Sequence, residues 1–231
     1  MLKVVNISLR SNFGKEFAEF VISRFKILSP NFSKILVLVP SKKSADILKS
    51  EFAKCNTISP KIVSLGEVDE TFLISQNMDI TSLIKVKSVP DIKIKFILFG
   101  IAKGYLQDFS SSAIFNFIED FLELENLILS NETDIVTTLV RAESVIENMA
   151  RRLQVSLVIF LKIYQDWQRY KLEHNIVTRF EKSILCLNAL KDCTFAGFEA
   201  VFTAFFEGTS RKQISLISFI YQLPHATLVL W

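Results

Sequence analysis

One stretch, residues 34–70, constrains the fold more than any other part of the chain. It opens with a continuous apolar run from Ile35 to Val39, which is typical of a strand buried on both faces of a parallel sheet. Pro40 ends that run, and Ser41 can cap a following helix whose apolar residues recur at helical spacing. A second short strand is expected from Lys61 to Ser64. The stretch therefore predicts a strand–helix–strand unit within a parallel sheet.

The first turn of this predicted helix carries Lys42, Lys43 and Ser44 directly after the capping residue Ser41. Positive side chains at a helix N-terminus oppose the helix macrodipole, so the two lysines are better explained if an anion binds there. Backbone amides, hydroxyl groups and lysine charges suit phosphate groups without reading a base sequence. The alternative interpretation is a capped surface helix with two solvated lysines.

The two ends of the chain repeat the alternation of strand and helix. A first strand is expected from Leu2 to Ser8 and a helix from Gly14 to Leu28. Near the C-terminus, Cys193 to Phe198 predicts a strand that runs into a glycine turn, Thr209 to Tyr221 a helix, and Ala226 to Trp231 a further buried strand. Because crossovers between parallel strands are right-handed, these outer pieces can share a single parallel sheet.

The middle of the chain has a different pattern. After residues 77–91, interpreted as a surface connection, apolar residues recur at intervals of three and four, which indicates helices with short joints and antiparallel neighbours. The expected helices span Ile92 to Leu106, Ser111 to Leu129, Thr133 to Met149, Gln154 to Glu173 and Arg179 to Leu190. The predicted fold is a discontinuous α/β domain, residues 1–90 and 191–231, with an all-helical subdomain inserted at 91–190.

Composition narrows the possible classes of protein. The densest apolar runs, Phe96 to Ala102 and Val155 to Leu161, are far shorter than the roughly 20 residues that span a bilayer, so no membrane association is expected. The N-terminus lacks a secretion signal, which predicts a cytoplasmic protein. The three cysteines, Cys55, Cys186 and Cys193, form no pair with metal-ligand spacing and offer no disulfide framework. The net charge of +3 does not by itself indicate nucleic acid.

Residues 9–17, LRSNFGKEF, invite comparison with a phosphate-binding loop. Gly14 and Lys15 are present, but the leading glycine is missing and Glu16 stands where a magnesium-binding hydroxyl is required. We therefore interpret Gly14 and Lys15 as a degenerate phosphate loop, and we assign no catalytic residue, metal ligand or cofactor. The competing enzyme hypothesis is a nucleotide hydrolase that uses this loop together with acidic residues at 67–70 for magnesium.

Two of the expected helices carry patterns with both a functional and a structural interpretation. Four acidic residues are placed on the outer face of the helix at 111–129, and we interpret this face as solvated rather than catalytic. They are Glu119, Asp120, Glu123 and Glu125, opposite an apolar side formed by Ile114, Phe117, Ile118, Phe121, Leu122 and Leu127. In the helix expected from Gln154 to Glu173, Tyr164, Trp167 and Tyr170 form one stripe. This stripe could stack bases of single-stranded DNA, although core packing is the favoured interpretation.

Four segments carry a resemblance to a known family. They are LVLVPSKKSADILKSEF at Leu36 to Phe52, KIVSLGEVDE at Lys61 to Glu70, the segment Ile163 to Leu190, and the segment Thr194 to Trp231. In this order they resemble the N-terminal helicase-like region of AddB, the second subunit of bacterial helicase–nuclease complexes that process double-strand breaks, and in particular its alphaproteobacterial type. The most specific phrase is the family marker formed by Leu65, Gly66, Glu67, Val68, Asp69 and Glu70.

The resemblance implies a P-loop-helicase-like parallel sheet, a role in recombinational double-strand break repair, and two partners: DNA and an AddA-like helicase–nuclease subunit. It implies that the phosphate loop is not functional. Residues Ser41, Lys42, Lys43 and Ser44 then occupy the place of the helicase element that contacts the backbone of a single strand. Since the subunit it resembles is several times longer, we expect a non-catalytic N-terminal fragment. A protein-interaction scaffold and a degraded gene remnant without activity are the alternatives.

Overall fold

The computed structural model describes residues 4–7, 12–131, 151–205 and 211–230. The chain divides into two compact units. The first comprises Met1–Ile80 with Leu185–Trp231, and the second comprises Thr81–Ile184. The insertion expected at 91–190 overlaps most of the second unit. Its expected start and end lie further toward the C-terminus than those of the unit.

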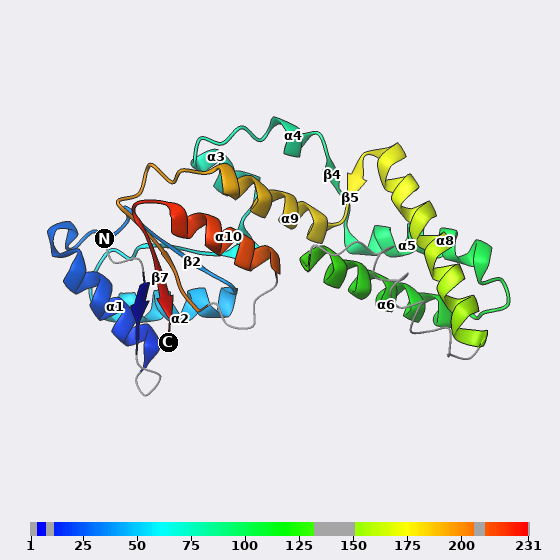
Figure 1. Cartoon of the computed structure of the whole chain (residues 1–231), viewed down its shortest axis with the longest axis horizontal. Helices are drawn as coiled ribbons and strands as arrows, with labels where there is room; N and C mark the ends of the chain where they lie inside the picture. Colours follow the sequence, from blue (N-terminus) through cyan, green and yellow to red (C-terminus); the bar gives the residue numbers. More distant parts are fainter. Residues whose placement is uncertain (1–3, 8–11, 132–150, 206–210, 231) are drawn as a thin grey trace. The chain divides into compact units, whose positions relative to one another are not determined.

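The first unit is built on one parallel sheet with the strand order β1-β7-β6-β2-β3. Its strands are β1 (Val4–Asn6), β2 (Ile35–Val39), β3 (Lys61–Ser64), β6 (Ala200–Thr203) and β7 (Ala226–Leu230). All four neighbouring pairs are parallel, and the first and last strands lie side by side (Figure 1). The predicted α/β class, with the two ends of the chain in one parallel sheet, is confirmed.

Strand β2 has the environment that its sequence predicts. All five of its residues are buried, since β3 and β6 flank it and both faces of the sheet are covered. Ile35, Val37 and Val39 alternate along the strand and enter the same core cluster as Phe17 and Phe52. A run of apolar residues without alternating polar positions is stable only in such a two-sided environment.

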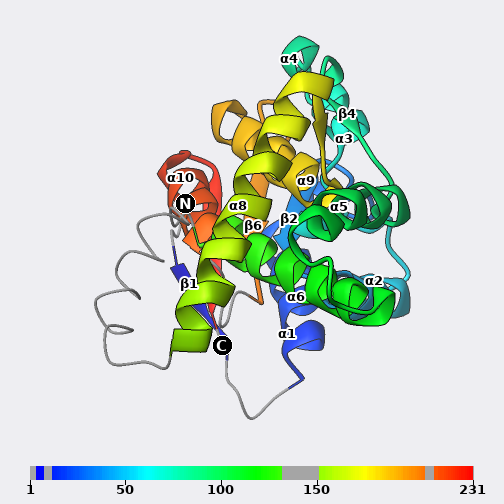
Figure 2. The ribbon, with the colours of Figure 1, turned by 90° about the vertical axis from the view of Figure 1, so that its right-hand side faces the viewer.

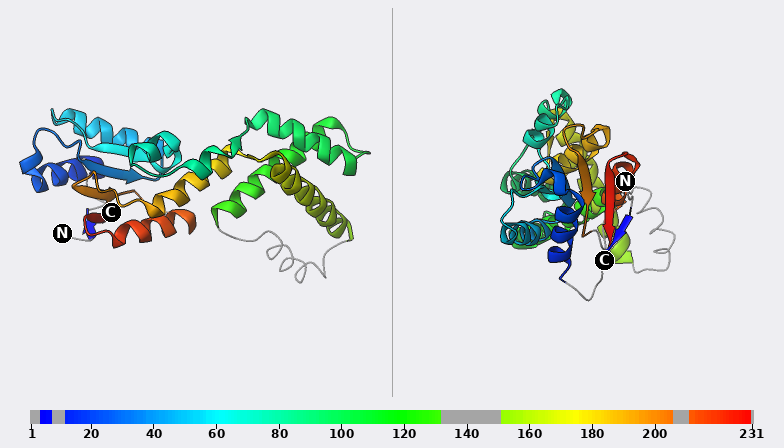
Figure 3. Two further views of the ribbon diagram at one scale, coloured as in Figure 1. Left: turned by 90° about the horizontal axis from the view of Figure 1, so that it is seen from above. Right: turned by 90° about the vertical axis from the view of Figure 1, so that its left-hand side faces the viewer.

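Helices cover both faces of this sheet. The connections contain α1 (Phe13–Arg24), η1 (Lys26–Leu28), α2 (Lys42–Lys54), η2 (Leu65–Glu67), α3 (Glu70–Ser75), η3 (Leu190–Asp192) and α10 (Arg211–Gln222). In Figure 3, α1 and α2, in blue and cyan, lie on one face of the sheet and α10, in red, lies on the other. Right-handed crossovers explain the arrangement, because the chain moves along the sheet in one direction through α1 and α2 and in the opposite direction through α10.

Phenylalanine rings dominate the core beneath α1. Phe202 of β6 is 1% exposed and meets three rings edge to face, those of Phe17, Phe20 and Phe25, at centroid distances of 5.7, 6.2 and 6.0 Å. Such perpendicular pairs stabilise a core beyond the burial of their area. The aromatic residues on the inner side of α1 therefore attach it to a central strand.

The strand expected at the beginning of Cys193 to Phe198 is wrong, whereas the glycine turn expected at its end is present. Phe195 has a positive φ of 51°, and the amide of Phe198 donates to the carbonyl of Phe195 at 2.9 Å, so this segment forms a turn. The strand begins after the turn, at Ala200, where a short run of consistently buried residues can enter the sheet between β2 and β7.

The second unit consists mainly of helices. It contains α4 (Thr81–Ile84), β4 (Lys87–Ser88), α5 (Asp91–Tyr105), α6 (Ser111–Ser130), α8 (Arg151–His174), β5 (Ile176–Val177) and the beginning of α9 (Arg179–Ala189). Helix α5 packs against both α6 and α8 (Figure 2). The helix expected from Thr133 to Met149 lies outside the described residues.

The aromatic stripe of α8 belongs to the core of this unit. Trp167 is fully buried, and Tyr164 and Tyr170 pack against the same cluster. The favoured core-packing interpretation of the stripe is confirmed, which removes Trp167 as a platform for nucleobases.

The connection at 77–91 carries more structure than expected. It contains α4 and β4, and β4 pairs in parallel with β5 so that the two connections of the helical unit are joined. Leu83 and Val89 are buried, and Asn175 donates from Nδ2 to the carbonyl of Lys85 at 2.6 Å. The segment is a connection, as expected, but Ile80, Leu83 and Val89 are buried and fix it in place, whereas Ile84 is 64% exposed.

None of the helices in the described ranges is both long enough and apolar enough to cross a bilayer.

Thiol reactivity offers a direct test of this fold. Cys55 is exposed, whereas Cys186 and Cys193 are buried, and burial raises the pKa of the Cys193 thiol. Because the thiolate is the reactive form, we expect iodoacetamide to alkylate Cys55 in the native protein and to spare Cys186 and Cys193 until the protein is denatured. Mass spectrometry of digested protein gives the modified positions, and a Cys55→Ser variant serves as the control. Rapid native modification of Cys193 would contradict the burial.

Candidate functional site

The first turn of α2 forms the candidate anion site. Ser41 has extended backbone angles, φ −135° and ψ 157°, and its Oγ accepts a hydrogen bond from the amide of Ser44 at 3.2 Å. The hydroxyl groups of Ser41 and Ser44 lie 2.9 Å apart. The predicted N-cap is confirmed. The amides of Lys42 and Lys43 belong to the same turn, in which backbone N–H groups have no acceptor within the helix.

The sheet topology puts this turn in a favourable place for ligand binding. It follows the carboxyl end of β2. From β2 the chain continues through α2 on one face of the sheet to β3, whereas from the other neighbour of β2, β6, it continues through α10 on the opposite face to β7. In open α/β sheets, such a switch point leaves a crevice outside the carboxyl ends of the strands where ligands bind. The Ser41 to Ser44 turn therefore lies at the edge of the sheet that parallel folds use for recognition.

The two lysines of the turn extend into solvent. The Lys42 side chain is 75% exposed, and its Nζ lies 4.0 Å from Oε1 of Glu67, the acid that follows β3. Lys43 is also exposed. An exposed ion pair of this kind contributes little free energy, about 1 kcal/mol or less, so Lys42 can exchange Glu67 for a phosphate group at small cost.

The surface beyond the turn has mixed charge. A shallow depression on the outer side of α2 is lined by Lys42, Lys43, Asp46, Ile47, Ser50 and Glu51. Within it, Glu51 forms an ion pair with Lys54 at 2.7 Å. Because acidic side chains accompany the lysines along α2, the positive charge of this surface is concentrated in the first turn of the helix. Binding there is expected to be modest and sensitive to salt.

Gly14 of the degenerate phosphate loop has a packing role. It is buried in the first turn of α1, where a Cβ atom would lie 3.1 Å from both Ile47 Cγ2 and Glu51 Cγ of α2. Such contacts are tighter than side chains normally allow, so the glycine lets α1 approach α2 closely. Lys15 is exposed, and its Nζ lies 3.8 Å from Oε1 of Glu19. The structure thus brings Gly14 next to the depression on α2, in the first turn of a helix.

The family marker at 65–70 is divided among several structural tasks. Leu65 and Val68 are buried, Glu67 pairs with Lys42, and the Asp69 carboxylate caps α3 by accepting the amide of Phe72 at 2.8 Å. In the ranges that the structure describes, no three His, Cys, Asp or Glu side chains gather in a group that could hold a metal ion. The acids of this phrase therefore have capping and surface partners.

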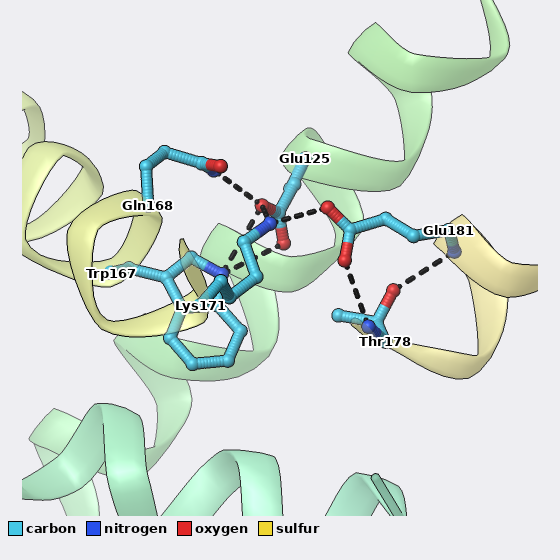
Figure 4. Close-up of polar contacts among 6 residues, drawn as sticks. All are labelled: Glu125, Trp167, Gln168, Lys171, Thr178 and Glu181. Carbon is cyan, nitrogen blue, oxygen red and sulfur yellow. Dashed lines mark hydrogen bonds and ion pairs between the residues drawn. The ribbon is translucent and has the colours of Figure 1, made fainter. Parts of the chain in front are cut away.

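A second polar cluster, in the helical unit, was missed by the sequence reasoning. Glu125 of α6 was expected to face solvent, and this expectation is wrong, since its side chain is 4% exposed (Figure 4). A signal was present in the sequence, because Ile114, Ile118, Phe121 and Glu125 follow the spacing of one buried helix face. The predicted inner position of Leu127 is also wrong, since Leu127 is 59% exposed.

We call Glu125, Lys171 and Glu181 the buried charge cluster. Lys171 Nζ lies 2.9 Å from Glu125 Oε1 and also donates to Glu181 Oε1. Glu125 accepts further hydrogen bonds from Trp167 Nε1 at 3.2 Å and from Gln168 Nε2 at 3.0 Å. The Lys171 and Glu181 side chains are 6% and 15% exposed. The lysine charge thus lies between two carboxylates that are removed from most of the solvent.

Glu181 also begins α9. Its Oε2 accepts the amide of Thr178 at 2.8 Å, and the Thr178 hydroxyl accepts the amide of Glu181 at 3.0 Å (Figure 4). This reciprocal pair is a capping box, which the spacing Thr-x-x-Glu indicates in the sequence. Through Lys171, the box joins the start of α9 to α6 and α8. Because both carboxylates already accept several hydrogen bonds, the cluster holds these helices together rather than performing acid–base chemistry.

The sequence was also compared with known proteins. It matches no protein-family model, and no curated protein is similar to it at a significant level.

Proposed function

We propose that this chain is a non-catalytic, helicase-like module of an AddB-like subunit, and that it contacts the phosphate backbone of single-stranded DNA through Ser41, Lys42, Lys43 and Ser44. The observation that carries the proposal is the capped first turn of α2, with two exposed lysines at the carboxyl edge of a parallel sheet. Backbone amides and lysine ammonium groups bind phosphate without reading bases, which suits a protein that processes DNA of any sequence.

Two features of the fold support the helicase-like part of the proposal. The five strands are parallel, and the second unit is inserted between β3 and β6, in keeping with the arrangement that the AddB resemblance implies. The use of Gly14 for helix packing and the presence of Glu16 in the first turn of α1 favour a module that does not hydrolyse nucleotide. In this proposal an AddA-like partner supplies the motor and double-strand break repair is the setting.

A double variant tests the proposed phosphate contact. We expect Lys42→Ala/Lys43→Ala to weaken binding to a fluorescein-labelled thymidine oligonucleotide by about 10-fold or more near 0.1 M salt, because two phosphate contacts are lost. The slope of log affinity against log salt should fall by about 1.4, since each contact with a single strand contributes about 0.7. Fluorescence anisotropy over a series of salt concentrations measures both quantities.

The matched control is Lys26→Ala/Lys49→Ala. Both of these lysines are exposed, Lys26 lies in η1 and Lys49 on the outer surface of α2, and the variant loses the same two charges. It should keep most of the affinity. If the two double variants lose affinity and slope equally, the effect comes from net charge, and the assignment of the contact to the first turn of α2 is wrong.

A further inference from the structure

The helical unit exposes a different aromatic surface from the one that the sequence suggested. Trp167 is buried, but Phe96 of α5 is 61% exposed and Ile92, one turn earlier, is 63% exposed. Ile94 and Leu98 form the buried side of the same helix. The core of the unit is therefore packed by the other side of α5, and the exposed Phe96 ring is available to a ligand.

One ring contacts Phe96, and a second ring supports the first. Phe115 of α6 meets it edge to face at a centroid distance of 6.0 Å, and Phe99 stacks on Phe115 at 4.8 Å with an interplanar angle of 20°. Phe99 and Phe115 are half-buried and pack against the core of the unit, whereas Phe96 is exposed. Because Phe115 restricts the Phe96 side chain, a planar ligand that stacks on this ring immobilises it at a small cost in conformational entropy.

The charges on α5 are mostly positive. The helix carries Lys93, Lys95 and Lys103 against a single acid, Asp91. Lys103 Nζ lies 5.9 Å from the centre of the Phe99 ring, and Lys95 neutralises Glu119 of α6 at 2.6 Å. An exposed aromatic ring flanked by lysines is the combination that binds bases and backbone of a single strand.

The helix surface beside the ring is bare. Gly100 lies one turn after Phe96, and a Cβ atom added to it would meet nothing within 4 Å. A glycine inside a helix is unfavourable relative to alanine, and no close contact with another described residue requires one at this position. The missing side chain leaves room for a flat group next to Phe96.

We infer that α5 forms a second contact with single-stranded DNA, in which an unpaired base stacks on Phe96 while Lys93 and Lys103 attract the neighbouring phosphates. This inference rests on the proposed function and adds to it a site that recognises bases through their π-faces. The lysines favour a polyanion over an apolar partner helix as the occupant. Stacking does not depend on base identity, so the contact has no sequence preference.

The test compares Phe96→Ala with Phe109→Ala, a variant at another exposed phenylalanine of the same unit, 59% exposed and C-terminal to α5. Two fluorescein-labelled probes of about 15 nucleotides are used, a thymidine oligonucleotide and the matching abasic oligonucleotide. We expect Phe96→Ala to bind the thymidine probe about 5-fold more weakly or worse, to bind the abasic probe like the parent chain, and to keep its salt slope. Phe109→Ala should bind both probes normally.

A second variant reports on the stacking itself. In a Phe96→Trp variant the new indole should retain affinity, and its fluorescence should be quenched by the thymidine probe and not by the abasic probe. Absence of this quenching, or equal binding of the thymidine probe by Phe96→Ala and the parent chain, overturns the inference. A Phe96→Ala defect of equal size on both probes also overturns it, because a loss that ignores the bases is not stacking.

The outcomes separate this inference from the proposed function. If Lys42→Ala/Lys43→Ala weakens binding and Phe96→Ala does not, the α2 contact stands and the α5 contact is rejected. If only Phe96→Ala weakens binding, the α2 contact is rejected instead. If the parent chain does not bind the probe, both are overturned. A change in sedimentation velocity for Phe96→Ala, with DNA binding unaffected, would show that the α5 face binds protein and would reject the inference.

Discussion

Replacement of Lys171 with alanine is expected to lower the free energy of unfolding of the helical unit by about 3–5 kcal/mol. The Lys171 side chain is 6% exposed and is the cation between Glu125 and Glu181. Without it, two carboxylates remain in a setting with little water and no counter-charge among the residues of the cluster. The loss includes the contact between the lysine and the Trp167 ring, whose centre lies 5.2 Å from Nζ.

Urea unfolding followed by the fluorescence of Trp167, in a Trp231→Phe background, measures this loss at the cluster itself. Lys162→Ala is the matched control, because Lys162 lies on the same helix and is exposed, and it should change stability by about 0.5 kcal/mol or less. Adding Glu125→Gln to Lys171→Ala should restore part of the stability, since it removes one unpaired carboxylate while keeping an acceptor for Trp167. If Lys171→Ala is as mild as Lys162→Ala, the cluster does not hold the helices together.

Replacement of Phe202 with alanine should lower the free energy of unfolding of the first unit by a similar amount, about 3–5 kcal/mol. Phe202 lies on β6 between two other strands, and it is the ring on which Phe17, Phe20 and Phe25 of the α1 region converge. Its removal leaves a cavity and breaks three perpendicular ring pairs. The backbone of β6 cannot close this cavity because hydrogen bonds to both neighbouring strands fix its position.

Urea unfolding followed by circular dichroism measures the effect. Phe202→Leu fills part of the space and should cost about 1.5 kcal/mol or less. Ile27→Ala is the surface control, because Ile27 is fully exposed and its truncation should change stability by no more than about 0.5 kcal/mol. If Phe202→Ala lowers the free energy of unfolding as little as Ile27→Ala does, Phe202 does not hold α1 against β6.

Local patterns predicted much of the first unit correctly. The bounds of β2 and β3 agree with the expected runs, and Ser41 caps α2, because proline, a hydroxyl residue and an unbroken apolar run determine backbone geometry over a few residues. The strand before α10 was misplaced because Cys193 to Phe198 has a strand-like composition, whereas the positive φ of Phe195 forms a turn there. Composition does not specify which residue of a short apolar segment adopts that conformation.

The candidate sites were predictable to different degrees. The hydroxyl and lysine residues of the α2 turn are consecutive, so the sequence alone identifies them as a group. The buried charge cluster combines three helices, with Glu125, Lys171 and Glu181 separated by 46 and 10 positions along the chain. Nothing local distinguishes Glu125 from the exposed acids beside it except its place on the apolar stripe of α6.

The sequence by itself determined the alternation of strands and helices, the parallel sheet and the chemistry available at the first turn of α2, because each follows from periodicity or from a few adjacent residues. Only the tertiary structure decided which side chains of similar pattern face inward. It buried Trp167 and left Phe96 exposed, and it paired Glu125 with Lys171, because the environment of a helix face depends on which other helices pack against it. The stretch at 34–70 keeps its predicted form, whereas the surface proposed to stack bases lies on a different helix from the one that the aromatic spacing indicated.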